Sequence, residues 1–200
     1  MRTALCFDLD GTITATELLP CIASHLGISS EMATLTRATM EGTISFEESL
    51  RLRCLILGMV PAEVVHGIVA SVPLNGDIVQ FIGARASDCF VVTGNLDVWI
   101  GPLVNSLRAT LYSSEGTFSE GRLVLNSILD KATAIDDLRT RCGYSRIIAV
   151  GDGANDVPML RNADVAIAFG GVHKPSNAAL EESDYVTYCQ QALCKLLKGL

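Results

Sequence analysis

Charged side chains are scarce in this 200-residue chain: they make up 18% of it, and the excess of acidic residues gives a net charge of −7. This balance argues against nucleic acid or an anionic membrane surface as the main partner. No apolar run approaches the length of a membrane span, and Asp8 interrupts the first short one, so we expect neither a membrane segment nor a secretory signal. Low-complexity segments and internal repeats are also missing. The composition therefore predicts a globular cytoplasmic protein.

Paired cysteine patterns are missing as well. The chain has seven cysteines, an odd number, and none of them forms a C-x-x-C pair. Most lie in apolar runs, which predicts buried free thiols in a reducing compartment. A length of 200 residues fits one domain, or one domain with a modest insertion.

Helical spacing dominates the chain from Thr16 to about Val72. Ser45 followed by Glu48 predicts a capping box that opens a helix over 46–57, which Gly58 ends. Three further helices are expected, over 17–26, 30–40 and 61–71. With no strand between them, residues 15–73 are predicted to form an inserted four-helix cap.

Short apolar strands alternate with helices in the rest of the chain, which predicts a parallel sheet covered on both faces. Strands are expected over 4–7, 89–93, 146–150, 164–169 and 185–187. Turn signals within 108–125 predict a small hairpin or flap. The predicted fold class is α/β: a three-layer, Rossmann-like core of residues 1–14 and 74–200, interrupted by the cap.

Three predicted strands end in loops that carry reactive side chains. Asp8 and Asp10 follow the first strand, Thr93 and Gly94 end the second, and residues 151–156 follow the third. Each loop alone could be a capping turn, but parallel strands bring all three to one edge of the sheet. Several carboxylates at one point need a cation, and oxygen-only ligands suit Mg²⁺. Together with glycine amides that can approach an anion, this pattern predicts phosphoryl chemistry.

Four ordered segments resemble the motifs of the haloacid dehalogenase superfamily of phosphatases. They are FDLDGTIT at 7–14, VVTGN at 91–95, Lys131, and GDGANDVPML at 151–160. The insertion after the first segment resembles the helical cap of the phosphoserine phosphatase branch. Within it, residues 40–42 and 45–53 are similar to the substrate-recognition segment of that branch.

The resemblance implies separate roles for the two aspartates of the first segment. Asp8 would be the nucleophile that becomes an aspartyl phosphate, and Asp10 would act as general acid and then general base. Mg²⁺ would be bound by Asp8, the main-chain carbonyl of Asp10 and Asp152. Asp156 would lie close behind, orienting ligands or waters.

The resemblance also implies a phosphate-binding set: Thr93, Gly94, Lys131 and Asn155. One position departs from the family pattern, which often has a second glycine where this chain has Asn95. We therefore expect a side chain on the phosphate-side wall of the pocket.

Arg53 is the most informative residue of the predicted cap. Helical spacing places it on one face with apolar residues, namely Phe46, Leu50, Cys54 and Leu57. An arginine on an apolar face without a local acidic partner needs an anion, such as a substrate carboxylate. The resemblance implies that Arg53 binds that carboxylate, that Glu17 binds an ammonium group, and that Met40 and Phe46 close over the substrate. The alternative is that Glu17 stabilises a helix N-terminus and Arg53 pairs within the cap.

The predicted function is a Mg²⁺-dependent phosphomonoester hydrolase that acts through an aspartyl phosphate, most simply on L-phosphoserine. One alternative is a phosphatase or phosphotransferase for another small metabolite, such as homoserine phosphate or phosphothreonine. A catalytically silent regulatory or binding module is the remote alternative. The expected partner is a small phosphorylated metabolite, with no nucleic acid and no membrane, and the expected state is a monomer or homodimer.

Overall fold

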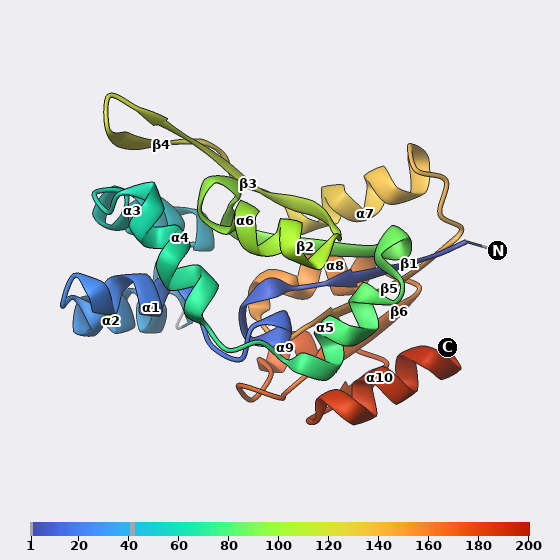
Figure 1. Cartoon of the computed structure of the whole chain (residues 1–200). Coiled ribbons are helices and arrows are strands. Elements are labelled where there is room, and N and C mark those ends of the chain that lie inside the picture. Colours follow the sequence, from blue (N-terminus) through green and yellow to red (C-terminus); the bar gives the residue numbers. More distant parts are fainter. Residues whose placement is uncertain (1, 41–42) are drawn as a thin grey trace.

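A seven-stranded sheet in the order β4-β3-β2-β1-β5-β6-β7 forms the centre of the computed structural model, which describes residues 2–40 and 43–200 without the side chain of Met40 (Figure 1). All neighbouring strands are parallel except β3 and β4. The α/β fold class is confirmed. The strands are β1 (Thr3–Phe7), β2 (Cys89–Leu96), β3 (Thr110–Ser119), β4 (Arg122–Ser127), β5 (Arg146–Gly151), β6 (Val165–Phe169) and β7 (Tyr185–Thr187).

The described helices include the four predicted between residues 15 and 73, whose ends lie within one residue of the expected ones. They are α1 (Leu18–His25), α2 (Ser29–Met40), α3 (Phe46–Leu57), α4 (Ala62–Ser71), α5 (Gly76–Gly83), α6 (Asp97–Leu107), α7 (Lys131–Thr140), α8 (Val157–Asn162), α9 (Asn177–Glu181) and α10 (Gln190–Gly199). Short helical turns cover Leu9–Ile13, Ala86–Asp88 and Ala154–Asp156.

Helices cover both faces of the sheet and make three layers. The side chains of β1 alternate between them: Leu5 and Phe7 join one buried cluster with α5, α6 and α10, whereas Ala4 and Cys6 join the other with α7, α8 and α9. Both faces of this strand are therefore buried, which explains its unbroken apolar run. Burial on both sides fixes the strand and the acidic loop that follows it.

Helices α1–α4 lie together to one side of the sheet, next to the β3–β4 hairpin (Figure 1). The chain enters and leaves this group at adjacent points, where Ala15 N–H donates to Pro73 O (2.8 Å) and Asn75 N–H donates to Ile13 O (2.9 Å). The predicted capping box of α3 is confirmed, because Ser45 Oγ accepts from Glu48 N–H (3.1 Å) while Ser45 N–H donates to the Glu48 carboxylate (2.8 Å).

Residues 108–125, predicted as a small hairpin or flap, largely coincide with the hairpin of β3 and β4, whose first strand belongs to the main sheet. β3 pairs with β2 in parallel before it pairs with β4, so it extends the sheet. The hairpin also reaches the helical group: a Cβ built at Gly58, just after α3, would lie 2.6 Å from Cβ of Leu123. This close approach ties the hairpin to the end of α3.

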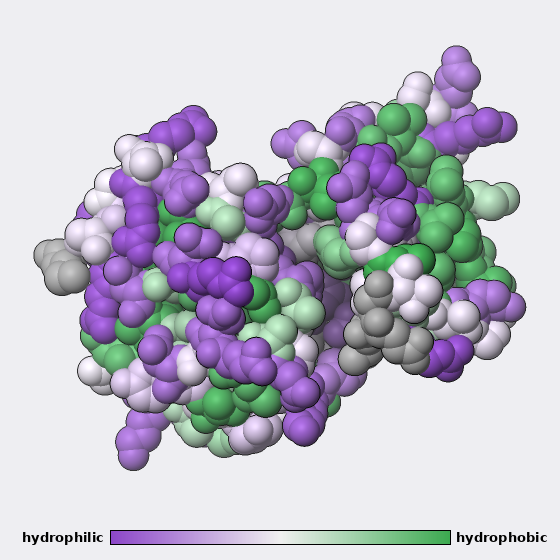
Figure 2. Space-filling model, turned by 180° about the vertical axis from the view of Figure 1, so that it is seen from behind, coloured by the Kyte–Doolittle hydropathy of each residue, from purple (hydrophilic) through white to green (hydrophobic). Residues whose placement is uncertain are grey.

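Hydrophobic surface gathers on the lobe formed by the helical group and the hairpin, and a notch separates it from the sheet lobe (Figure 2). Exposed apolar side chains on α3 and the hairpin include Leu55 and Val124. Among the described helices, none is by itself long and apolar enough to cross a membrane. Taken together, α3 and α4 have sufficient length and apolar composition, but the pair is bent by 112°.

The prediction of buried thiols is partly confirmed. Cys6, Cys54, Cys89 and Cys194 are buried and free, whereas Cys142 and Cys189 are exposed.

Candidate active site

The acidic pair begins where β1 ends. Asp8 is 4% exposed, and its N–H donates to Val150 O (2.9 Å), which continues the pairing of β1 with β5 past the last strand residue. The chain then turns sharply at Gly11, whose φ of +72° favours glycine. A Cβ at this position would lie 3.2 Å from Oδ2 of Asp152. Glycine therefore lets the first loop approach the carboxylate contributed by the loop after β5.

Lys131 provides the positive charge of the site. It is the first residue of α7, is 3% exposed, and its Nζ lies 2.5 Å from both Asp8 Oδ1 and Asp156 Oδ1. Burial alone would lower the pKa of this ammonium group, but Asp156 and Asp8 outweigh that effect and raise the pKa. The side chain therefore stays charged and holds the two carboxylates together.

Asp156 organises the loop after β5. Its Oδ2 accepts from Asp152 N–H (2.9 Å) and Gly153 N–H (2.8 Å), and its Oδ1 accepts from Lys131. A Cβ at Gly151 would lie 2.5 Å from Cγ of Asp156, so glycine is needed there. With both oxygens engaged, Asp156 supports the loop from behind.

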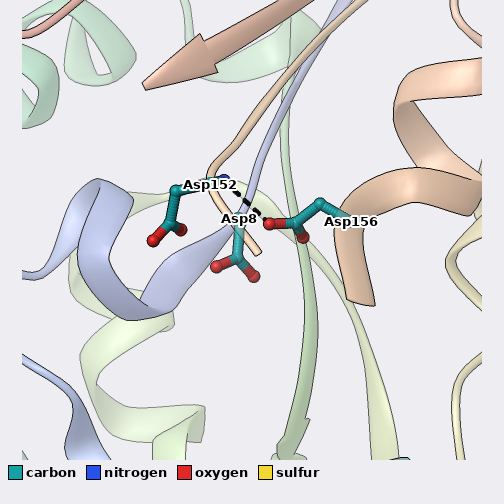
Figure 3. Close-up of side chains that lie close together, drawn as sticks. All are labelled: Asp8, Asp152 and Asp156. Atoms are coloured by element: carbon teal, nitrogen blue, oxygen red, sulfur yellow. Dashed lines mark hydrogen bonds between the residues drawn. The ribbon is translucent and has the colours of Figure 1, made fainter. Parts of the chain in front are cut away.

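The carboxylates of Asp8, Asp152 and Asp156 converge, and those of Asp8 and Asp152 point the same way, side by side (Figure 3). One oxygen from each lies within 4.8 Å of the others. Within the described part of the chain, Asp8 Oδ2 and the Asp152 carboxylate receive no hydrogen bond from a side chain. This buried acidic triad thus leaves hard oxygen donors available for a small divalent cation.

Asp10 has different hydrogen-bond partners from Asp8. Its Oδ1 accepts from Leu18 N–H (2.7 Å) at the start of α1, and its Oδ2 accepts from the side-chain amide of Asn95 (2.8 Å). Asp10 is therefore held by hydrogen-bond donors, whereas Asp8 is held by the ammonium group of Lys131. The two aspartates of the first segment have non-equivalent environments, as distinct chemical roles require.

A small cavity of about 70 Å³ joins the sheet edge to the helical group. Predicted site residues from the sheet edge and from the helical group line this cavity. They are Asp8, Asp10, Glu17, Phe46, Thr93, Gly94 and Asn155, with Leu19, Leu50 and Asn95 completing the wall. A larger groove of about 490 Å³ between α5 and α10 contains none of the predicted site residues.

Phe46 closes the cavity from the side of α3. Its ring lies against the main chain of Gly94, and a Cβ at Gly94 would be 2.6 Å from Cζ of Phe46. Glu17 precedes α1, and its Oε1 lies 3.5 Å from Nε2 of His173. Glu17 and Phe46 therefore face the same space as Asp8.

Arg53 does not line this cavity, but its charge acts on Glu17, which does. It shares a face with buried Leu50 and Cys54, as predicted, and its Nη2 donates to Thr36 Oγ1 on α2 (2.9 Å). Its Nε is buried and has no partner among the described residues. The guanidinium group is therefore only partly satisfied. The side chain of Met40 and residues 41–42 lie outside the described part of the structure, so the predicted role of Met40 stays a prediction.

Burial and mutual repulsion dominate the electrostatics. Burial, and then Asp156, raise the pKa of Asp8 well above its ordinary range, although Lys131 opposes this. The same two causes raise the pKa of Asp152 to about 7. Burial, followed by the charges of Asp10 and Asp152, raises the pKa of Glu17 to about 8. In this state the cluster carries more negative charge than it can stabilise, so cation binding at the acidic triad is favoured.

Sequence reasoning missed two side chains. Asn95 departs from the family pattern, but nothing in that pattern predicts its hydrogen bond to Asp10. Thr36 gave no signal, because it meets Arg53 only through the packing of α2 against α3.

Known proteins share both the sequence pattern and the fold. The family model described as haloacid dehalogenase-like hydrolase matches residues 5–161. A phosphoserine phosphatase of Lactococcus lactis is 27% identical over 177 residues, 82% of each chain. One of Halobacterium salinarum is 30% identical over 178 residues, 82% of this chain and 84% of that one. A substrate-bound phosphoserine phosphatase structure superposes with a TM-score of 0.83 at 24% identity, covering 100% of this chain and 99% of that one.

The chain belongs to the haloacid dehalogenase-like hydrolase family. Within it, the chain falls in the phosphoserine phosphatase-like branch, whose members are phosphoric monoester hydrolases. The predicted family, fold and class of enzyme are confirmed.

Proposed function

We propose that this chain hydrolyses L-phosphoserine through a covalent phosphate ester of Asp8. The observation that carries the proposal is the contrast between the two aspartates: Asp8 is paired with Lys131, whereas Asp10 accepts two hydrogen bonds nearby. Curated relatives named phosphoserine phosphatase support the substrate. The small cavity that both aspartates line supports a compact ester.

In the first half-reaction a carboxylate oxygen of Asp8 attacks phosphorus, and the bond from phosphorus to the serine oxygen breaks. The leaving alkoxide takes a proton from Asp10. In the second half-reaction Asp10 removes a proton from water, which attacks the aspartyl phosphate and releases inorganic phosphate. Lys131 offsets the repulsion between the Asp8 carboxylate and the phosphate dianion.

Mg²⁺ fits the oxygen-only donor set. Asp8, Asp152 and the main-chain carbonyl of Asp10 would hold it, with Asp156 fixing the loop behind them. When bound, it supplies the positive charge that buried carboxylates and a phosphate group share. The raised pKa of Asp152 supports this assignment, because burial of the carboxylate and repulsion from Asp156 outweigh the positive charge of Lys131.

Thr93, Gly94, Lys131 and Asn155 are proposed to bind the phosphate oxygens. Thr93 is 1% exposed at the end of β2, and its Oγ1 accepts from Asn95 N–H (3.1 Å), which leaves its own hydrogen free to donate. Gly94 and Asn155 line the cavity, and Lys131 contacts Asp8.

We propose residues 15–73 as a substrate-selecting cap on a core of residues 1–14 and 74–200. Glu17 would bind the substrate ammonium group, Arg53 its carboxylate, and Met40 and Phe46 would close over it. Arg53 does not line the cavity in this structure, but it lies close enough to interact electrostatically with Glu17 and Asp10, which do. Its partly unsatisfied guanidinium group supports an anionic ligand.

The net charge of −7 supports a small phosphorylated metabolite as partner rather than nucleic acid. A cytoplasmic monomer or homodimer remains our prediction for the assembly.

The decisive experiment measures phosphate release from phosphoserine, phosphothreonine and homoserine phosphate, with and without Mg²⁺. We expect phosphoserine to be preferred and Asp8→Asn to abolish turnover, while Asp136→Asn, on the exposed side of α7, retains it. Analysis of products in the presence of added alcohols separates hydrolysis from phosphoryl transfer. Full activity of Asp8→Asn would refute the covalent mechanism.

A further inference from the structure

Asn95 lies where β2 departs from regular pairing. The register of β2 against β3 shifts between Thr93 and Leu96, so the residues between them leave the ladder. Asn95 is nevertheless 5% exposed. A buried amide off the ladder needs partners of its own, and those partners reveal what it does.

The orientation of the Asn95 amide follows from its two partners. Its Nδ2 donates to Asp10 Oδ2 (2.8 Å), and its Oδ1 accepts from Leu96 N–H (3.3 Å). A backbone N–H can only donate and a carboxylate can only accept, so the amide cannot be reversed without losing both contacts. Leu96 thus directs the amino group of Asn95 at Asp10.

The carboxylate of Asp10 is consequently held from both sides. Leu18 N–H binds Oδ1 from the cap side, and Asn95 binds Oδ2 from the end of β2. If the Asn95 amide were removed, the bond from Leu18 N–H would be the one that remains among the described residues, and the carboxylate could then rotate. General acid–base catalysis depends on placing that carboxylate within hydrogen-bond reach of the leaving oxygen and of water.

We propose that Asn95 is a positioning residue, which acts through Asp10 by holding its carboxylate in the orientation needed to protonate the leaving group and then to activate water. This inference rests on the proposed function. It predicts that the side chain of Asn95 matters for steps that need Asp10 and is unimportant for steps that do not. The main-chain bond from Asn95 to Thr93 is separate and survives replacement by alanine.

Two phosphate donors separate these steps. Phosphoserine has an alkoxide leaving group that needs a proton, whereas acetyl phosphate releases acetate, which does not. We expect Asn95→Ala to form phosphoenzyme from phosphoserine about tenfold or more slowly than wild type, but from acetyl phosphate within about threefold of the wild-type rate. Breakdown of the phosphoenzyme by water should also slow about tenfold. Acid-quenched, single-turnover reactions measure all three rates.

A double-mutant comparison tests whether Asn95 acts through Asp10. In an Asp10→Ala background, Asn95→Ala should cause no further loss with phosphoserine, because its partner is already gone. Asn126→Ala, on the exposed part of the hairpin, is the matched control and should behave as wild type. Asn95→Ser gives the same comparison if the alanine variant does not fold.

The possible failures differ. Equal slowing with both donors, or additive losses in the double variant, would show that Asn95 does not act through Asp10. Wild-type rates in Asn95→Ala would overturn its role altogether. A wild-type chain that forms no phosphoenzyme from either donor would instead contradict the proposed function together with this inference.

Discussion

The ring of Phe46 on α3 lies so close to the main chain of Gly94 at the end of β2 that a Cβ at residue 94 would be 2.6 Å from Cζ of the ring. This contact joins the helical group to the sheet edge directly over the candidate site, because both residues line the same cavity. The packing of Phe46 over the site therefore requires glycine at residue 94. This requirement is separate from any contact between the main-chain amide of Gly94 and phosphate.

Gly94→Ala should prevent full closure, because the added methyl group and the ring cannot both keep their positions. We expect kcat/KM for phosphoserine to fall about tenfold or more. Combining the change with Phe46→Leu, which shortens the opposing side chain, should restore part of the loss. If the double variant is slower than Gly94→Ala alone, steric conflict with Phe46 is not the cause.

Lys131→Met should destabilise the fold and abolish phosphoenzyme formation. The variant leaves Asp8 and Asp156 buried without their shared cation, and breaking a buried pair costs about 3–5 kcal/mol. Urea unfolding in the absence of divalent cations measures the loss. Lys195→Met on the exposed side of α10 provides the control and should change neither property.

A second variant separates stability from catalysis at the same place. Lys131→Met combined with Asp156→Asn removes one of the two uncompensated charges and should recover part of the unfolding free energy. Activity should remain absent, because Asp8 still lacks its cation. Recovery of activity would show that Lys131 acts only through folding.

Much of this arrangement could be predicted from the chain, since it follows from local sequence and sheet topology. An apolar run buried on both faces places Asp8 and Asp10 at a sheet edge, and the parallel β2 and β5 bring Thr93 and Asp152 to the same edge. The capping box of Ser45 and Glu48 fixes where α3 begins. These features can be predicted from short-range sequence patterns and from the rule that the carboxyl ends of parallel strands meet at one edge of a sheet.

The contacts that sequence reasoning missed depend on packing between elements far apart in the chain. Asn95 meets Asp10 because the register of β2 shifts after Thr93, and a shift of this kind leaves no periodic signal in the sequence. Thr36 meets Arg53 across two helices, at a depth set by the side chains between them. Similarly, the placement of β3 in the main sheet depends on pairing with β2 rather than on its own turn residues.

Thr36→Val should weaken recognition of the substrate carboxylate without affecting chemistry. The Thr36 hydroxyl is the hydrogen-bond partner that the structure gives the Arg53 guanidinium, and valine keeps its shape without the oxygen. We expect KM for phosphoserine to rise about tenfold or more, since a hydrogen bond to a charged group contributes about 1.5–3 kcal/mol, with kcat nearly unchanged. The inhibition constant of phosphoethanolamine, which lacks the carboxylate, should not change.

The control for this prediction lies on the same helix. Thr34→Val removes an exposed hydroxyl that donates to Ser30 O on its own helix, so it should leave both constants unaltered. Arg53→Ala should raise KM for phosphoserine more than Thr36→Val does. If KM for phosphoserine and the inhibition constant of phosphoethanolamine changed equally, Thr36 and Arg53 would not recognise the substrate carboxylate.

The metal-free protein should lose stability as pH rises from about 4 to about 8. Carboxyl groups in an unfolded chain have pKa values near 4, whereas in the folded chain the pKa of Asp152 is raised to about 7 and that of Glu17 to about 8. Across this interval the folded state holds more protons than the unfolded state, so the unfolding free energy falls with rising pH. The positive charge of Arg53 opposes the rise in the pKa of Glu17 without removing it.

Mg²⁺ should reverse the trend, because it binds the ionised carboxylates of the folded chain in preference to the unfolded one. We expect thermal unfolding with a chelator to occur about 5 °C or more lower at pH 8 than at pH 5, and added Mg²⁺ to raise the midpoint more at pH 8. Asp152→Asn should reduce both the pH dependence and the response to Mg²⁺, since it removes one ionisable ligand. A metal-free midpoint that rises between pH 5 and pH 8 would contradict the electrostatic account of the acidic triad.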